Sequence, residues 1–159
     1  SIRTPLVIAG PNIAPGRRTQ AFCYLYDVLP TIGRVCGVQP PAGSEGIELT
    51  GVLKEPNQPG RPALLFAYRN LQRAIRQDQW KLIRYPQVNR TQLFDLKADP
   101  HETTNLADRP EYADTLAQLS RQLQQMMQSA GDSTPWTAPH PKPAQWHPPS
   151  EENIPTGRK

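Results

Sequence analysis

Histidines, cysteines and clustered carboxylates are the side chains in this sequence that could do chemistry. The three histidines are His101, which lies in a turn, and His140 and His147, which lie in a proline-rich tail. No two of them have the spacing of metal ligands. The sequence also has neither a glycine-rich phosphate loop nor a G-x-S-x-G nucleophile elbow. We therefore predict no catalytic residue and no metal ligand in this chain.

Three carboxylates, Asp95, Asp99 and Glu102, lie close together in the sequence and raise the alternative of a calcium site. A structural role is favoured, because Asp99 is followed by proline and so opens a turn. Glu102 and Asn105 can then accept hydrogen bonds from N–H groups of the loop. We expect these carboxylates to hold loops in place.

Cys23 and Cys36 are each flanked by apolar residues, which is typical of buried free thiols rather than of a disulfide or a zinc site. The net charge is +4, but the basic residues are scattered and no Lys/Arg run exceeds two. We predict no nucleic-acid partner, because basic residues interleaved with aromatic ones are missing. No apolar run is long enough to span a membrane, so no membrane partner is predicted either.

The elements that would position such side chains begin with an apolar run over residues 6–9, bounded by Pro5 and Gly10. Such a run predicts a strand buried on both faces. This chain offers it few parallel neighbours, so we expect them in preceding sequence and interpret the start of the chain as a cut.

A helix is predicted over residues 24–37, with Asp27 as N-cap, Pro30 in the first turn and Gly37 at the C-terminal end. A second, short helix is predicted over 47–53. The first helix has one apolar face, formed by Val28, Leu29, Ile32, Val35 and Cys36.

A small antiparallel sheet is predicted next, with strands over 63–68, 72–76, 79–85 and 91–96 and a hairpin turn at Gln77-Asp78. Trp80, Leu82 and Arg84 should share one face of it.

A long helix from Pro110 to Ala130 should cover this sheet, with a capping box formed by Asp108 and Glu111 and an end at Gly131. Its apolar face comprises Tyr112, Leu116, Leu119, Leu123, Met126 and Ala130. We expect Leu116, Leu119 and Leu123 to pack on Trp80, Leu82 or Phe94.

Three regions follow from these elements. Residues 1–57 are interpreted as the end of an α/β domain, and 58–131 as an α+β subdomain of antiparallel sheet and helix. Residues 132–159 are proline-rich and polar. They are expected to form either a disordered tail or an arm over a missing domain.

Taken together, five segments resemble the C-terminal part of sulfatases, including arylsulfatases and N-acetylgalactosamine-6-sulfatase-like enzymes. They are RTPLVIAGP (3–11), DVLPT (27–31), GIEL (46–49), RAIRQDQWKLI (73–83) and LFDLKADPHETTNLA (93–107). Glu48 stands where the family usually has serine. Each segment is weak evidence by itself, but five in this order and spacing are specific.

The resemblance implies an alkaline-phosphatase-like α/β fold and an enzyme that hydrolyses sulfate esters, acting on a sulfated carbohydrate or aryl sulfate through the missing half. It also implies a calcium ion and a formylglycine made from the cysteine of a C-x-P-x-R motif. Neither Cys23 nor Cys36 fits that motif, so neither cofactor is assigned to this chain. The family implies a periplasmic or extracellular location.

Two alternatives remain open: a non-catalytic accessory or glycan-binding domain, or a piece of another alkaline-phosphatase-like phosphodiesterase or phosphonate hydrolase. If this chain contacts substrate, we predict that Tyr68 and Arg69 do so, because they follow an apolar strand and enter a loop. Arg69 can pair bidentately with sulfate and Tyr68 can stack on a sugar ring. The competing interpretation is an ordinary hairpin loop with a solvated arginine.

Overall fold

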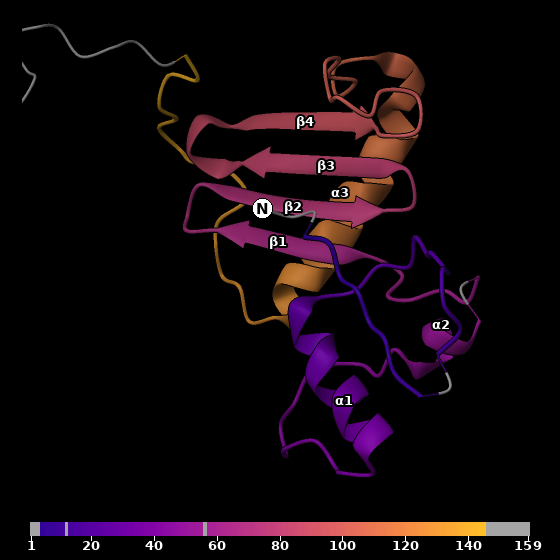
Figure 1. Ribbon diagram of the computed structural model, residues 1–159. Coiled ribbons are helices and arrows are strands. Elements are labelled where there is room, and N and C mark those ends of the chain that lie inside the picture. Colours follow the sequence, from indigo (N-terminus) through magenta and orange to yellow (C-terminus); the bar gives the residue numbers. More distant parts are fainter. Residues whose placement is uncertain (1–3, 12, 56, 146–159) are drawn as a thin grey trace, which may run out of the picture. The chain divides into compact units, whose positions relative to one another are not determined.

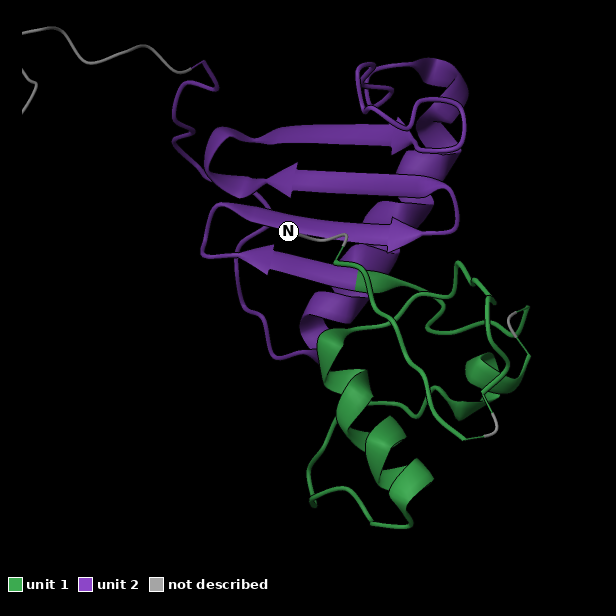
Figure 2. Ribbon diagram, in the orientation of Figure 1, with its two compact units in different colours: residues 1–64 green, residues 65–159 purple. Residues whose placement is uncertain are grey.

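The computed structural model of the protein describes residues 4–11, 13–55 and 57–145. The chain divides into two compact units, residues 1–64 and residues 65–159, drawn in green and purple in Figure 2. The first unit carries short helices and long loops, and the second carries a sheet and a long helix (Figure 1). The mixed α/β content agrees with the predicted fold class. The functional boundary that we place after residue 57 stays a prediction.

The first unit is built around helix α1, residues Val28–Cys36, which follows a 3-10 turn. The helix ends at Gly37, which takes the left-handed conformation with a φ of 71°. The Val38 N–H donates to the Gly33 carbonyl at 2.8 Å, which closes a Schellman motif. The predicted C-terminal end is therefore confirmed. Helix α2, residues Thr50–Lys54, begins later than predicted.

One expectation for this unit is wrong. Residues 4–11 do not form a strand, and Leu6 and Val7 are 44% and 88% exposed. An extended segment becomes a strand only when a neighbour satisfies its N–H and C=O groups, and no strand of the described residues pairs with it. The predicted apolar face of α1 is exposed at Leu29, Ile32, Val35 and Cys36, and the buried residues of the helix are Pro30 and Thr31.

The second unit contains a four-stranded sheet in the order β1-β2-β3-β4, with β2, β3 and β4 paired antiparallel. The strands are β1 (Leu64–Tyr68), β2 (Gln72–Gln77), β3 (Trp80–Tyr85) and β4 (Arg90–Asp95). All four predicted strands are present. The β2–β3 turn comprises Asp78 and Gln79, one residue later than predicted, because Gln77 pairs with Trp80.

The predicted alternation of side chains across this sheet is confirmed, and helix α3, residues Ala113–Ser129, covers one face of it (Figure 1). The Trp80 ring on that face contacts the Tyr112 ring edge-on, with centroids 5.8 Å apart. Phe94 lies on the opposite face, since it pairs with Lys81. The core beneath the helix comprises Ile75, Leu82, Leu93, Leu119, Leu123 and Met127.

Both ends of α3 are defined by its flanking residues. A 3-10 turn over Pro110–Tyr112 precedes the helix, and no side chain caps it. The capping box predicted from Asp108 and Glu111 is therefore wrong, because Arg109 occupies the N-cap position of that turn. At the other end Gly131 has a φ of 68°, and the Asp132 N–H donates to the Met127 carbonyl at 2.8 Å. This Schellman motif ends the helix where predicted.

The proline-rich segment after α3 packs on its own unit over the described residues. Ala138 and the Asn89 side chain exchange two hydrogen bonds of 2.9 Å. The Lys142 N–H donates to the Gln87 carbonyl at 2.8 Å. Residues 132–142 are thus ordered by specific partners near the ends of the strands. Whether the segment also lies over a further domain stays a prediction. Residues 146–159 lie outside the described residues.

Candidate functional site

The turn between β1 and β2 carries the two predicted substrate-binding side chains, Tyr68 and Arg69. The Leu71 N–H donates to the Tyr68 carbonyl at 3.0 Å, which closes the turn. Arg69 takes a left-handed φ of 48°, which is uncommon for a residue other than glycine. Its guanidinium carbon lies 5.7 Å from the centroid of the Tyr68 ring, and Tyr68 is 55% exposed. The two side chains are adjacent and reachable from solvent.

The side chain of Arg73, the second residue of β2, binds the backbone of this turn. Its side chain is 7% exposed. Nη1 donates to the Arg69 carbonyl at 2.5 Å, while Nε and Nη2 form an ion pair with Asp132. Nη2 also donates to the Thr134 hydroxyl. A buried arginine therefore links the turn that bears Arg69 to the segment after α3.

The Asp132 carboxylate is held ionised by these contacts. The Arg73 guanidinium holds the pKa of Asp132 far below its usual range. Sequence reasoning missed this pair, because Arg73 and Asp132 are 59 positions apart and only the Schellman turn at the end of α3 brings them together.

Asp95 and Asp99 have the structural role that we favoured, whereas the Glu102 carboxylate accepts from the Lys81 side chain and not from a loop N–H. Asp95 accepts hydrogen bonds from the N–H groups of residues 97 and 98. Asp99 accepts from the Thr104 N–H at 2.9 Å, and Glu102 pairs with Lys81 at 2.5 Å. Within the described residues, no group of three His, Cys, Asp or Glu side chains could hold a metal ion. These residues therefore do not fit a calcium site.

The histidines and cysteines are not brought together. His101 and His140 are exposed, and His147 lies outside the described residues. Both cysteines are free thiols, as predicted. Burial raises the pKa of the half-buried Cys23. Cys36 is exposed, which corrects the expectation that both thiols are buried.

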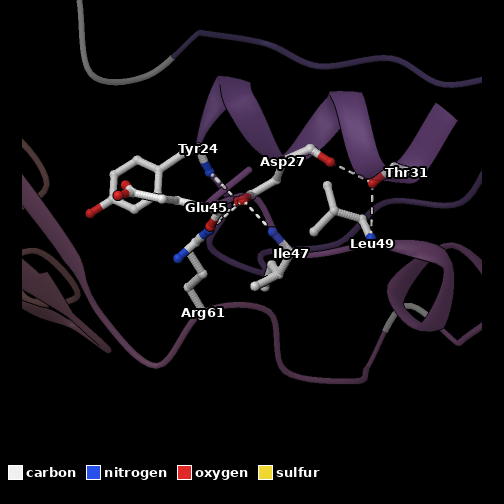
Figure 3. Close-up of polar contacts among 7 residues, drawn as sticks. All are labelled: Tyr24, Asp27, Thr31, Glu45, Ile47, Leu49 and Arg61. Carbon is white, nitrogen blue, oxygen red and sulfur yellow. Dashed lines mark hydrogen bonds and ion pairs between the residues drawn. The ribbon is translucent and has the colours of Figure 1, made fainter. Parts of the chain in front are cut away.

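A second polar cluster, centred on Asp27, lies in the first unit (Figure 3). Asp27 is fully buried, and its carboxylate accepts from the Tyr24 N–H at 2.7 Å and from the Ile47 N–H at 2.9 Å. Arg61 donates two more hydrogen bonds, from Nε at 2.8 Å and from Nη2 at 2.5 Å. Asp27 thus occupies the N-cap position of α1, as predicted, but its side chain makes no capping hydrogen bond to that helix. Its carboxylate instead joins the start of the helix to the loops that carry Ile47 and Arg61.

The charge of this cluster is balanced. Burial acts to raise the pKa of Asp27, but the hydrogen bonds from Arg61, Ile47 and Tyr24 outweigh it and lower that pKa. The Arg61 guanidinium also lies over the stacked rings of Tyr24 and Tyr26, 4.8 and 5.1 Å from their centroids. The charges of Asp27 and Arg61 are thus paired with each other, and their bonds position the start of α1.

A family model for the C-terminal region of N-sulphoglucosamine sulphohydrolase matches residues 1–129 of the chain. Choline-sulfatase of Rhizobium meliloti is 37% identical over 117 residues, which are 69% of this chain and 22% of the relative. An N-acetylglucosamine-6-O-sulfatase of Bacteroides thetaiotaomicron is 30% identical over 146 residues, or 84% of this chain and 26% of the relative.

A solved structure of a 2-O GAG sulfatase superposes with a TM-score of 0.57 at 29% identity, covering 67% of this chain and 25% of that one. The chain thus spans about a quarter of the length of these relatives. No helix among residues 4–11, 13–55 and 57–145 is long and apolar enough to cross a membrane.

Proposed function

Because the chain belongs to the sulfatase family, we propose that it forms the C-terminal part of an enzyme that hydrolyses sulfate esters of carbohydrates. The match of residues 1–129 to the C-terminal family model carries this proposal. The calcium ion and formylglycine typical of the family are assigned to the part of the enzyme that precedes this chain, since the described residues offer no fitting ligand set. A periplasmic or extracellular location follows from the same family.

Two alternatives are not favoured. Several relatives that match this region are themselves sulfatases, such as choline-sulfatase, which argues against an independent accessory domain. A phosphonate monoester hydrolase of Agrobacterium radiobacter shares the fold, but the family model that matches describes a sulphohydrolase.

Within this function, Tyr68 and Arg69 are proposed to contact the substrate. Arg69 can donate two parallel hydrogen bonds to a sulfate group or sugar carboxylate, and Tyr68 can stack on a sugar ring. Three observations support this proposal. The two side chains are exposed, they contact each other, and Arg73 fixes their turn by binding the Arg69 carbonyl. A fixed turn would lower the cost of ordering the two side chains on binding.

Replacing Arg69 by alanine in the complete enzyme tests this role. One charge-assisted contact is worth roughly 1.5–3 kcal/mol, so kcat/KM for the sulfated carbohydrate should fall about 10- to 100-fold. The melting temperature should change little, because the Arg69 side chain is exposed.

The matched control is Arg121→Ala, which removes an exposed arginine from α3. It should leave kcat/KM within about twofold of the parent, since surface substitutions rarely affect a distant site. Parental kcat/KM in Arg69→Ala would make Arg69 a surface residue. If the parent enzyme itself fails to hydrolyse any sulfate ester, the broader proposal fails.

A further inference from the structure

The C-terminal end of α3 and the segment that follows it, both orange in Figure 1, border an open hollow of about 280 Å³, which we call the Trp136 hollow. Gln124, Met127 and Gln128 line it from the helix, and residues 132–134 and Trp136 line it from the segment. Its volume is near the lower limit for small-molecule sites. The hollow can therefore take one ring of a ligand rather than a chain.

Two buried arginines hold the segment that lines this hollow. Arg73 and Arg84 pair with each other across β2 and β3. Arg73 binds the Asp132 carboxylate and the Thr134 hydroxyl. Arg84 Nε donates to the Trp136 carbonyl at 2.9 Å, and the Arg84 guanidinium carbon lies 5.4 Å from the centroid of the Trp136 ring. The indole is therefore held in place before a ligand arrives, which lowers the entropic cost of binding.

Several polar groups around the Trp136 hollow are available to a ligand. Among the described residues, no hydrogen bond involves the side-chain amides of Gln124 and Gln128. The same holds for the Ser133 hydroxyl and the Trp136 indole N–H within the described part of the chain. Amides and hydroxyls both donate and accept hydrogen bonds. The hollow thus combines an aromatic ring with donors and acceptors that have no partner in this part of the chain.

The Trp136 hollow carries no free charge over the described residues. Asp132 lines it, but the Asp132 carboxylate is paired with Arg73. No lysine, arginine or histidine of the described residues is part of the lining. An anion such as sulfate would therefore find no cation here. A sugar ring fits better, because its apolar face can stack on an indole while its hydroxyls meet neutral polar groups.

We propose that the Trp136 hollow binds one neutral sugar ring, stacked on the Trp136 indole and hydrogen-bonded by Gln124 and Gln128. This site rests on the proposed function for the choice of a carbohydrate as ligand. Within a sulfated carbohydrate it would hold a ring that bears no charge at the point of contact. Binding there would add affinity for longer substrates without touching the sulfate ester.

Fluorine NMR of the complete enzyme labelled with 5-fluorotryptophan tests the site. The Trp136 signal is identified as the one that disappears in Trp136→Phe. The probes are the methyl glycosides of N-acetylglucosamine and galactose. At least one of them should shift the Trp136 signal saturably, with a dissociation constant of about 1–10 mM, as expected for a single ring. The Trp80 signal is the internal control and should not move, since that ring packs on the Tyr112 ring.

Two variants locate the contact. Gln124→Ala and Gln128→Ala should each weaken sugar binding about 2- to 10-fold, because each removes a hydrogen bond. Gln125→Ala is the matched control, at an exposed position of α3 that is not part of the lining, and should bind like the parent.

The site would be overturned if neither sugar shifts the Trp136 signal, or if both lining variants keep the parental dissociation constant. An equal shift with sodium sulfate would also overturn it, because the hollow would then bind anions. The measurement needs no turnover. An enzyme that binds sugar here but hydrolyses no sulfate ester would defeat the proposed function alone, and an active sulfatase without this binding would defeat the site alone.

Discussion

At the scale of single residues, Asp27 shows how a motif residue acquires a role different from its sequence-based one. The Asp-x-x-Pro-Thr segment predicts a helix cap, and Asp27 does precede α1. Burial with Arg61 as partner converts it into the centre of a cluster that joins the start of the helix to two loops. A buried carboxylate of this kind is tolerated only because every lone pair has a donor.

We predict that Asp27→Asn destabilises the 159-residue chain by roughly 3 kcal/mol, because it leaves the Arg61 guanidinium without its counter-charge. Urea titration followed by circular dichroism measures the change. Asp108→Asn, which alters an exposed carboxylate, is the control and should change the free energy of unfolding by less than about 0.5 kcal/mol.

The ion pair of Asp27 and Arg61 makes the stability of the folded chain depend on pH. The folded pKa of Asp27 lies below its ordinary value, so its contribution to stability is complete above about pH 4 and is lost as the pH falls through the folded pKa. The difference in stability between the parent and Asp27→Asn should therefore shrink below about pH 4. A constant difference down to pH 2 would contradict the lowered pKa.

At the scale of elements, α3 holds the second unit together through one row of apolar side chains. Leu119 and Leu123 are 2% and 0% exposed, as the spacing predicts. Met127, which is 5% exposed, completes the row, whereas Met126, predicted from the sequence, is only half-buried. The sheet beneath supplies Ile75, Leu82 and Leu93.

Leu119→Ala should therefore lower the free energy of unfolding by about 2–5 kcal/mol, the cost of a buried cavity. The denaturant midpoint measures this loss. Gln118→Ala, at an exposed position of the same helix, should leave the midpoint nearly unchanged. An unchanged midpoint in Leu119→Ala would mean that α3 does not cover the sheet.

At the scale of the whole molecule, the two units differ in how complete their apolar cores are. The second unit buries its core beneath α3, whereas the first exposes Leu6, Val7 and most apolar side chains of α1. A domain normally buries its apolar faces against a second layer. The contrast agrees with a chain that spans about a quarter of its relatives.

We predict that the 159-residue chain alone does not hydrolyse sulfate esters. Its sequence contains no C-x-P-x-R motif from which a formylglycine could form, so the nucleophile of the family is missing. The measurement is turnover of an aryl sulfate by the purified chain with added calcium, beside the complete enzyme as positive control. Calcium-dependent turnover by the chain would contradict both this prediction and the assignment of the catalytic residues to preceding sequence.

The sequence by itself determined the elements whose signals are local. Alternating apolar residues located the four strands, and a row at helical spacing located α3, since these periods depend on backbone geometry alone. Gly37 and Gly131 marked helix ends because both adopt positive φ. The exposed pair Tyr68 and Arg69 could also be placed on a turn, although its role stays a proposal.

Only the tertiary structure decided which face of each element is buried and which distant groups meet. The outward turn of α1 depends on Asp27 meeting Arg61, 34 positions away, and the packing of the last described segment depends on Asn89 meeting Ala138. The link from Arg69 through Arg73 to Asp132 has the same origin. Such ion pairs and hydrogen bonds have no periodic signature, because their energies depend on burial and distance in space rather than on spacing along the chain.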